Sequence, residues 1–187
     1  MKRLYFFILC LCFSNFLFGQ QSPIIGYDKL EFGATIEAFQ RLYPTAKEIS
    51  SNQNSIGVRM FQQRNVGSGI TARDFKFFNN KFYYVTVIYD EMNNNNTINA
   101  LLDRIVEIYG KFDNKEEDTD VSGGAYTEET YLYRRYRNNF YIQFCIFKSF
   151  FPNGGIIYQV LISYYNPITT NEVAAAEKKQ AGRGLGL

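Results

Sequence analysis

Oxygen-bearing side chains recur at short spacing in one acidic stretch of the sequence. Its members are Asp118, Asp120, Ser122, Gly123 and Glu129, which stand at positions 1, 3, 5, 6 and 12 of a twelve-residue window. Calcium-binding loops have this spacing, because Ca²⁺ takes several oxygen ligands, a glycine permits the sharp turn and a carboxylate closes the shell. Residues 130–137 have a strand pattern in place of the usual exit helix. The stretch therefore predicts either a weak extracellular-type calcium site or an acidic, solvated connector.

Tyrosine and arginine interleave directly after that stretch. Side chains two residues apart on a strand share one face. This periodicity groups Tyr131, Tyr133, Arg135 and Arg137. Aromatic rings beside arginine can stack on bases, and they also anchor protein interfaces. The alternative is a half-exposed strand whose arginine stems cover aromatic surface. The protein-contact interpretation makes these four residues a candidate interaction surface.

Groups suited to catalysis are few. The chain contains no histidine, which removes the commonest general base and the commonest metal ligand. Cys145 lies in an apolar alternating run, which indicates a buried small side chain and not a nucleophile. We therefore expect a non-enzymatic protein with no cofactor other than the candidate calcium. The enzymatic alternative, a hydrolase without histidine, requires carboxylates from separate elements to meet in one cleft.

Residues 1–19 have the pattern of a secretory signal peptide. Lys2 and Arg3 precede an uncharged apolar run, and Gly19 supplies a small residue for cleavage. The run is shorter than the roughly 20 apolar residues that span a bilayer. A retained membrane anchor and a lipoprotein are the alternatives, and the leucines before Cys10 and Cys12 disfavour lipidation. The pattern predicts a periplasmic or extracellular protein.

Cleavage of the signal leaves a neutral chain. The sequence has 20 Lys and Arg against 18 Asp and Glu, and two of the cations lie in the signal, so 18 face 18 afterwards. A neutral domain has no overall field that attracts nucleic acid or anionic lipid. We expect an envelope or extracellular protein as partner, no nucleic acid, and membrane contact only through an uncleaved signal segment.

Hydrophobic periodicity and turn residues divide the remaining chain into strands and helices. Asn79-Asn80 predicts a tight hairpin turn, since asparagine tolerates positive φ. Thr35 and Thr97 are predicted helix caps, and Thr169 with Glu172 forms a predicted capping box. The expected strands are 24–32, 56–63, 70–78, 81–90, 131–137, 140–148 and 156–165, the expected helices are 36–43, 98–109 and about 170–180, and 111–129 is the expected loop.

This order predicts an α+β domain with an antiparallel sheet and two main helices on one face. A helix followed by three strands occurs twice, which indicates a duplicated unit. The expected organisation is a signal peptide over 1–19, a single domain over 20–168, and a C-terminal helix with a frayed tail over 169–187. Aromatic residues fall on both alternating faces of the strands, so the second sheet face is either covered or a partner surface.

The opening Phe32-Gly33-Ala34-Thr35, followed by a helix and antiparallel strands, resembles small bacterial envelope modules. The layout is similar to the outer-membrane assembly lipoprotein BamE and to the tandem-repeat β-lactamase inhibitory protein. The resemblance implies an exported α+β module and transfers no functional residue. The two disulfides of the inhibitory protein cannot form with one cysteine left after cleavage. We expect an exported interaction module, with a small-ligand or calcium-binding protein as the alternative.

Overall fold

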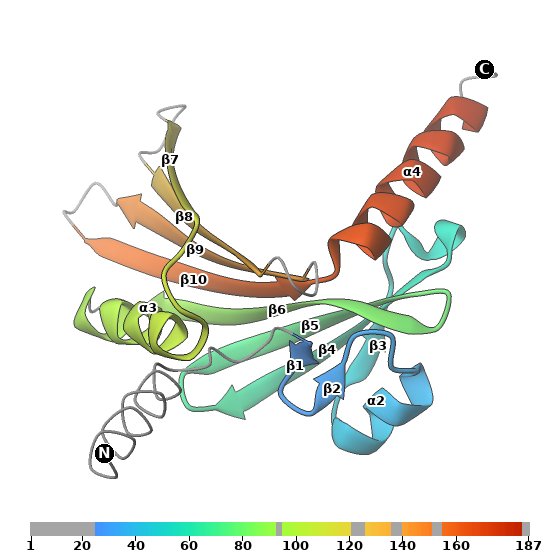
Figure 1. Ribbon diagram of the computed structural model, residues 1–187, viewed down its shortest axis with the longest axis horizontal. Helices are drawn as coiled ribbons and strands as arrows, with labels where there is room; N and C mark the ends of the chain where they lie inside the picture. The colour runs from blue at the N-terminus through green and yellow to red at the C-terminus, as the bar shows by residue number, and fades with distance from the viewer. Residues whose placement is uncertain (1–24, 93–94, 121–125, 136–139, 151–154, 185–187) are drawn as a thin grey trace, which may run out of the picture.

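The computed structural model describes residues 25–92, 95–120, 126–135, 140–150 and 155–184, with the backbone alone for residues 55, 91, 92, 117–120, 126–135 and 150. Three helices and two antiparallel sheets follow one another in this part of the chain (Figure 1). The elements are β1 (Gly26–Tyr27), β2 (Leu30–Glu31), α2 (Ile36–Leu42), β3 (Lys47–Ile49), the 3₁₀ turn η1 (Asn54–Ile56), β4 (Val58–Gly67), β5 (Ile70–Phe78), β6 (Lys81–Met92), α3 (Asn95–Tyr109), β7 (Asn114–Asp120), β8 (Tyr126–Arg135), β9 (Phe140–Phe150), β10 (Ile156–Tyr165) and α4 (Pro167–Gly184).

The main sheet has eight antiparallel strands in the order β3-β4-β5-β6-β10-β9-β8-β7. It consists of two meanders, each preceded by a helix, and the last strands of the two meanders, β6 and β10, pair at the centre. The predicted α+β class and antiparallel sheet are confirmed. Helices α2 and α3 are each followed by four strands and not three, because β3 and β7 add an outer strand to the two units.

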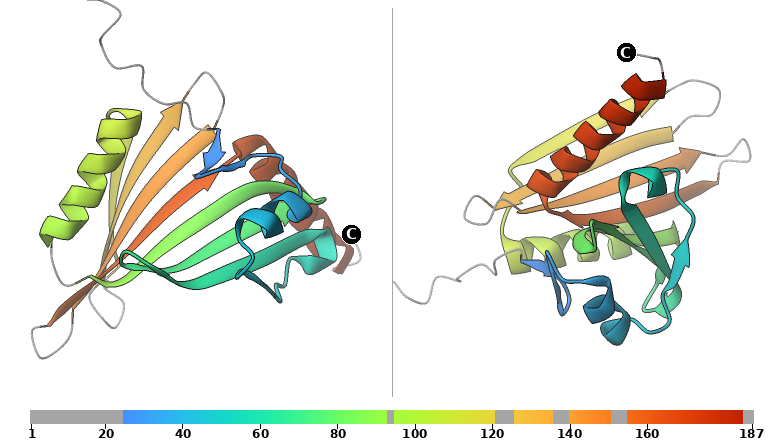
Figure 2. Two further views of the ribbon diagram at one scale, coloured as in Figure 1. Left: turned by 90° about the horizontal axis from the view of Figure 1, so that it is seen from below. Right: turned by 90° about the vertical axis from the view of Figure 1, so that its right-hand side faces the viewer.

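Helices α2 and α3 cover the same face of this sheet, which we call the helix face (Figure 2). Ile36 and Phe39 of α2 are buried in one cluster with Val85 of β6. Ile98 and Ile105 of α3 are buried in a second cluster. That second cluster includes Val87 of β6, two residues beyond Val85 and therefore on the same side of the strand. The predicted placement of both helices on one face is confirmed.

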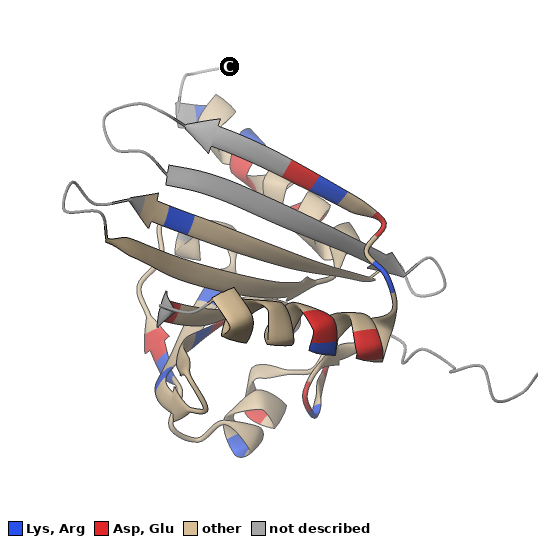
Figure 3. Ribbon diagram, turned by 90° about the vertical axis from the view of Figure 1, so that its left-hand side faces the viewer, with Lys and Arg blue, Asp and Glu red and all other residues tan. Residues whose placement is uncertain are grey.

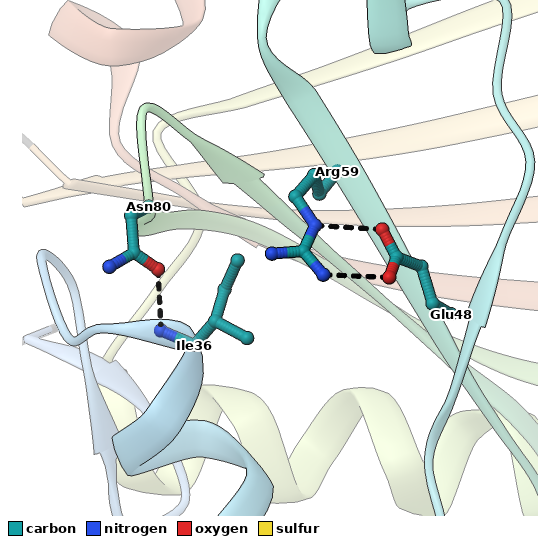
Figure 4. A network of polar contacts seen from close by, with 4 residues as sticks. All are labelled: Ile36, Glu48, Arg59 and Asn80. Carbon is teal, nitrogen blue, oxygen red and sulfur yellow. Dashed lines mark hydrogen bonds and ion pairs between the residues drawn. The ribbon is translucent and has the colours of Figure 1, made fainter.

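Helix α2 begins where the sequence predicts, directly after its cap, Thr35. The Thr35 hydroxyl accepts a hydrogen bond from the backbone N–H of Ala38 at 3.3 Å. The Asn79-Asn80 turn is also confirmed, with φ values of 49° and 63°. Asn80 does more than turn the chain, because its Oδ1 accepts a bond from the Ile36 N–H at 3.1 Å (Figure 4). Two of the free N–H groups at the start of α2 are thereby satisfied.

Two helix starts differ from the sequence prediction. Helix α3 begins at Asn95, so Thr97 lies inside it. Helix α4 begins at Pro167, and its cap is Asn166, whose Oδ1 accepts bonds from the N–H groups of Ile168 at 3.0 Å and Thr169 at 3.4 Å. Asparagine is as good a cap as threonine, and proline is favoured at the first helical position, so the Asn-Pro pair sets this start. The helix continues to Gly184, beyond the predicted end near residue 180 and into the first residues of the predicted frayed tail.

The predicted loop over 111–129 is wrong. Residues 114–120 form β7, which pairs with β8 in an antiparallel hairpin. Acidic and polar residues are depleted in strands, so their composition predicted a loop. Pairing along β8 overrides this local preference. The structure also divides the predicted strand 24–32 into β1 and β2, which turn at Asp28 with a φ of 54°.

The β1–β2 hairpin lies on the helix face and contacts both units. Tyr27 packs on Phe75 of β5 and on Tyr164 of β10, with ring centroids 6.2 and 5.2 Å apart. Among the described residues, no helix combines the length and the apolar character needed to cross a membrane. The predicted signal peptide and its cleavage position at Gly19 lie outside the described residues, and every described element begins after them.

Candidate binding face

The sheet side opposite α2 and α3 is the candidate functional surface, and we call it the open face. The sheet bends so that β7–β10 rise from the plane of β3–β6, and α4 rises at the opposite end (Figure 1). Helix α4 packs at the rim, where Val173 is buried with Val58 and Tyr83. The centre of the open face therefore lies in the angle between α4 and the raised strands.

Three tyrosines form a stacked row across the three central strands of this face, near the strand ends that adjoin α4. Tyr84 of β6 pairs with Tyr165 of β10, which pairs with Tyr141 of β9. The rings of Tyr84 and Tyr165 have centroids 5.7 Å apart, and those of Tyr165 and Tyr141 are 5.2 Å apart and within 13° of parallel. The Lys76 ammonium lies 5.0 Å from the centre of the Tyr84 ring. We call Tyr84, Tyr165 and Tyr141 the tyrosine row, and all three are partly exposed.

Polar side chains lie beside the tyrosine row. Tyr84 donates from its hydroxyl to Ser163 at 3.1 Å, and Ser163 lies 3.2 Å from the Thr86 hydroxyl. Gln62 donates to Asp74 at 2.8 Å. A sheet face that combines ring edges, hydroxyls and amides suits a protein partner, since tyrosine supplies apolar area together with a polar handle.

The tyrosines and arginines predicted as an interaction surface lie elsewhere. Tyr131, Tyr133 and Arg135 belong to β8, and Arg137 is outside the described residues. In the register, Tyr131 is opposite Phe144 and Tyr133 is opposite Ile142. Phe144 and Ile142 are fully buried, in the cluster that also contains Ile98 and Ile105 of α3. Positions 131 and 133 of β8 therefore continue cross-strand rows of the helix face. That surface stays a prediction, and it is separate from the tyrosine row.

Sequence reasoning did not find the tyrosine row, although a signal for it exists. Tyr84 precedes Val85, and Tyr141 precedes Ile142, so each tyrosine alternates with a buried residue. That alternation places each one on the second face of its own strand. Their meeting depends on the β6–β10 pairing between the two units, which local periodicity does not reveal.

The candidate calcium ligands fall in and beside the β7–β8 hairpin. Asp118 and Asp120 are in β7 and Glu129 is in β8, whereas Ser122 and Gly123 lie outside the described residues. Asp118 pairs with Glu128, and Glu129 pairs with Glu117. The ligand positions therefore span a hairpin and not one continuous loop. Calcium binding stays a prediction that calorimetric titration with calcium tests.

Other chemistry is sparse in the described part of the chain. Among its side chains, no three acidic, cysteine or histidine groups lie close enough to hold a metal ion. Cys145 is buried, with 8% of its surface exposed, as its apolar run predicted. Figure 3 shows cations and anions interspersed over α3 and the start of β7. The described charges on α3 and at the start of β7 are therefore of mixed sign.

An exposed ion pair joins the first two strands of the main sheet. Glu48 and Arg59 form an ion pair with two hydrogen bonds of 2.7 Å across β3 and β4 (Figure 4). Both side chains are about half exposed, at 48% for Arg59 and 44% for Glu48, so the pair contributes little to stability. The chain matches no family model, and neither a curated protein nor a solved structure matches it.

Proposed function

We propose that the protein is an exported, non-enzymatic interaction module that binds an envelope or extracellular protein on its open face. The observation that carries this proposal is the tyrosine row across the three central strands of the open face. Tyrosine is enriched among the residues that dominate binding energy at protein interfaces. Stacking fixes the three rings against one another, so little side-chain freedom remains to be lost on binding.

The composition supports a protein partner over a reaction or a polyanion. The chain lacks histidine, and the one cysteine beyond the predicted signal is buried. The charge after predicted cleavage is zero, from 18 cations and 18 anions. Export rests on the basic start and short apolar run of residues 1–19. Cleavage there removes none of the described elements.

Site-directed photocrosslinking in the producing cells tests this proposal. A photoreactive p-benzoylphenylalanine replaces Gln143, which lies on the open face two residues from Tyr141. The matched control replaces Gln40, which is exposed on α2 on the other side of the sheet. We expect a discrete adduct from position 143 that disappears in Tyr165→Ala. Absence of an adduct, or the same adducts from both positions, would rule the open face out as the partner site.

A further inference from the structure

A second feature of the open face is a hollow between two β-bulges. The register of β4 with β5 shifts between Arg64 and Gly67, and that of β10 with β6 shifts around Gln159. Asn65, with a φ of 53°, belongs to the first irregularity. Asn65 and Gln159 both line one hollow of about 380 Å³. Bulges concentrate beside binding and active sites, where they redirect side chains.

The floor of the hollow is apolar and small. Ala72 of β5 is buried, and its register partner Ile88 of β6 lies next to it. An alanine between longer neighbours leaves the space that a larger side chain would fill. The volume falls at the lower end of small-molecule sites, which hold about 300 Å³ or more.

The walls carry one charge of each sign. Arg64 stands on β4 and Asp90 on β6, and both line the hollow. Arg64 uses its Nε to donate to Gln62 Oε1, and Asp90 accepts from Gln159 through Oδ1. In the described part of the chain, neither residue takes part in an ion pair. The terminal guanidinium nitrogens and one carboxylate oxygen remain available to a ligand.

The two charged walls lie at opposite ends of the floor. Arg64 is level with Ala72 and Ile88, whereas Asp90 lies two residues beyond Ile88. The Cα atoms of Arg64 and Asp90 are therefore roughly 12 Å apart, across two strand spacings and two residue rises. Both residues line the same hollow, so a short zwitterion can lie between them. A carboxylate would meet Arg64, an ammonium would meet Asp90, and an apolar side chain would lie over Ala72 and Ile88.

We propose that the hollow between the bulges binds a free α-amino acid with an uncharged side chain. The site is distinct from the tyrosine row and goes beyond the proposed protein contact. It shares the sheet face, so an amino acid bound there would lie beside a docked partner. The Gln62 amide holds Arg64 in place while donating to Asp74, which fixes the cationic wall before a ligand arrives.

Isothermal titration calorimetry of the full chain with L-leucine tests the assignment. N-acetyl-L-leucine removes the ammonium charge and L-leucinamide removes the carboxylate. We expect one-to-one binding of L-leucine and a loss of about 10-fold or more with either blocked form, because each loses a charged hydrogen bond. No heat with L-leucine at millimolar concentration would overturn the proposal, as would equal binding of all three compounds.

Variants locate the binding on the molecule. Arg64→Gln and Asp90→Asn should each weaken L-leucine binding about 10-fold or more, since each removes one charged partner. Ala72→Leu should abolish binding by filling the floor. Arg59→Gln, which removes another exposed β4 arginine, should leave affinity unchanged. The two charge variants decide the question if Ala72→Leu fails to fold. Unchanged affinity in both would overturn the site, whereas the photocrosslink at position 143 reports separately on the protein partner.

Discussion

At the scale of the residue, Asn80 couples a turn to a helix that starts 44 residues earlier. Its φ of 63° closes the β5–β6 hairpin, and its Oδ1 accepts from Ile36 N–H at 3.1 Å. The turn itself could be predicted from the Asn pair, because asparagine tolerates the left-handed region. The bond to α2 could not, since it depends on how the helix packs over the sheet.

The two roles of Asn80 are separable by mutation. Asn80→Gly keeps the left-handed turn and loses the bond to Ile36, so we expect the free energy of unfolding to fall by about 1 kcal/mol. Asn80→Ala also strains the backbone, which adds about 1 kcal/mol. Urea denaturation measures both, with the exposed Lys81→Ala as control. Equal losses of stability in the glycine and alanine variants would show that the left-handed φ at position 80 does not contribute to the free energy of unfolding.

Buried tyrosines make stability sensitive to alkaline pH. Burial raises the pKa of Tyr27 to about 12, from an ordinary value of 10. Burial also raises the pKa values of Tyr43, Tyr83 and Tyr164. The neutral forms are favoured in the folded state, so their stabilisation is complete below pH 10 and is lost as the pH rises through the folded pKa.

We therefore expect the urea midpoint to be steady from pH 8 to 9.5 and to fall from pH 10 towards pH 12. Tyr27→Phe should make the accompanying fall in the free energy of unfolding shallower, by at most about 1.4 kcal/mol per pH unit, because one titrating group is removed. Absorbance at 295 nm follows tyrosine ionisation in the same samples. A midpoint that begins to fall well below pH 10 would show that another group controls it.

At the scale of the element, strand bounds could be read for β5 and β10, whose observed bounds, Ile70–Phe78 and Ile156–Tyr165, equal the predicted ones. Both strands are rich in β-branched and aromatic residues and lie between clear turn signals. Strand β7 could not be read, because Asn114–Asp120 is nearly all charged or polar. Its strand conformation follows from pairing with β8, a non-local effect that outweighs propensity.

Helix α4 offers a direct comparison between two capping schemes. The sequence pattern favours Thr169 with Glu172, whereas the described hydrogen bonds run to Asn166. We expect Asn166→Ala to lower the free energy of unfolding by about 1 kcal/mol and to reduce helicity in circular dichroism. Thr169→Ala should change stability by no more than about 0.5 kcal/mol. A larger loss of stability in Thr169→Ala than in Asn166→Ala would show that the predicted capping box, and not Asn166, caps the helix.

At the scale of the molecule, two units of similar layout meet through β6 and β10. The repeat of a helix with a meander could be anticipated from the two capped helical patterns. The order of the eight strands could not, because the β6–β10 register joins residues about 75 positions apart, such as Ile88 and Leu161. Such long-range pairing leaves no local signal in the chain. The open face depends on it, since the tyrosine row crosses that seam.

The chain around the N-terminal β1–β2 hairpin packs across this β6–β10 seam, where the two units meet, on the helix face. Phe32 follows β2, and its ring lies 5.3 Å from that of Phe82 in the first unit and 4.7 Å from that of Phe140 in the second. One side chain therefore packs on both units at once. If the units form a single cooperative structure, removal of this ring destabilises both together.

We expect Phe32→Ala to lower the free energy of unfolding by about 2–3 kcal/mol, somewhat below a fully buried phenylalanine because the side chain is partly exposed. Unfolding should remain a single transition, and hydrogen exchange should accelerate in β5 and β9 alike. Leu42→Ala, at a position 43% exposed on α2, should cost far less. Exchange that accelerates in one unit only, or a second unfolding transition, would show that the two units are stable independently and that the seam does not couple them.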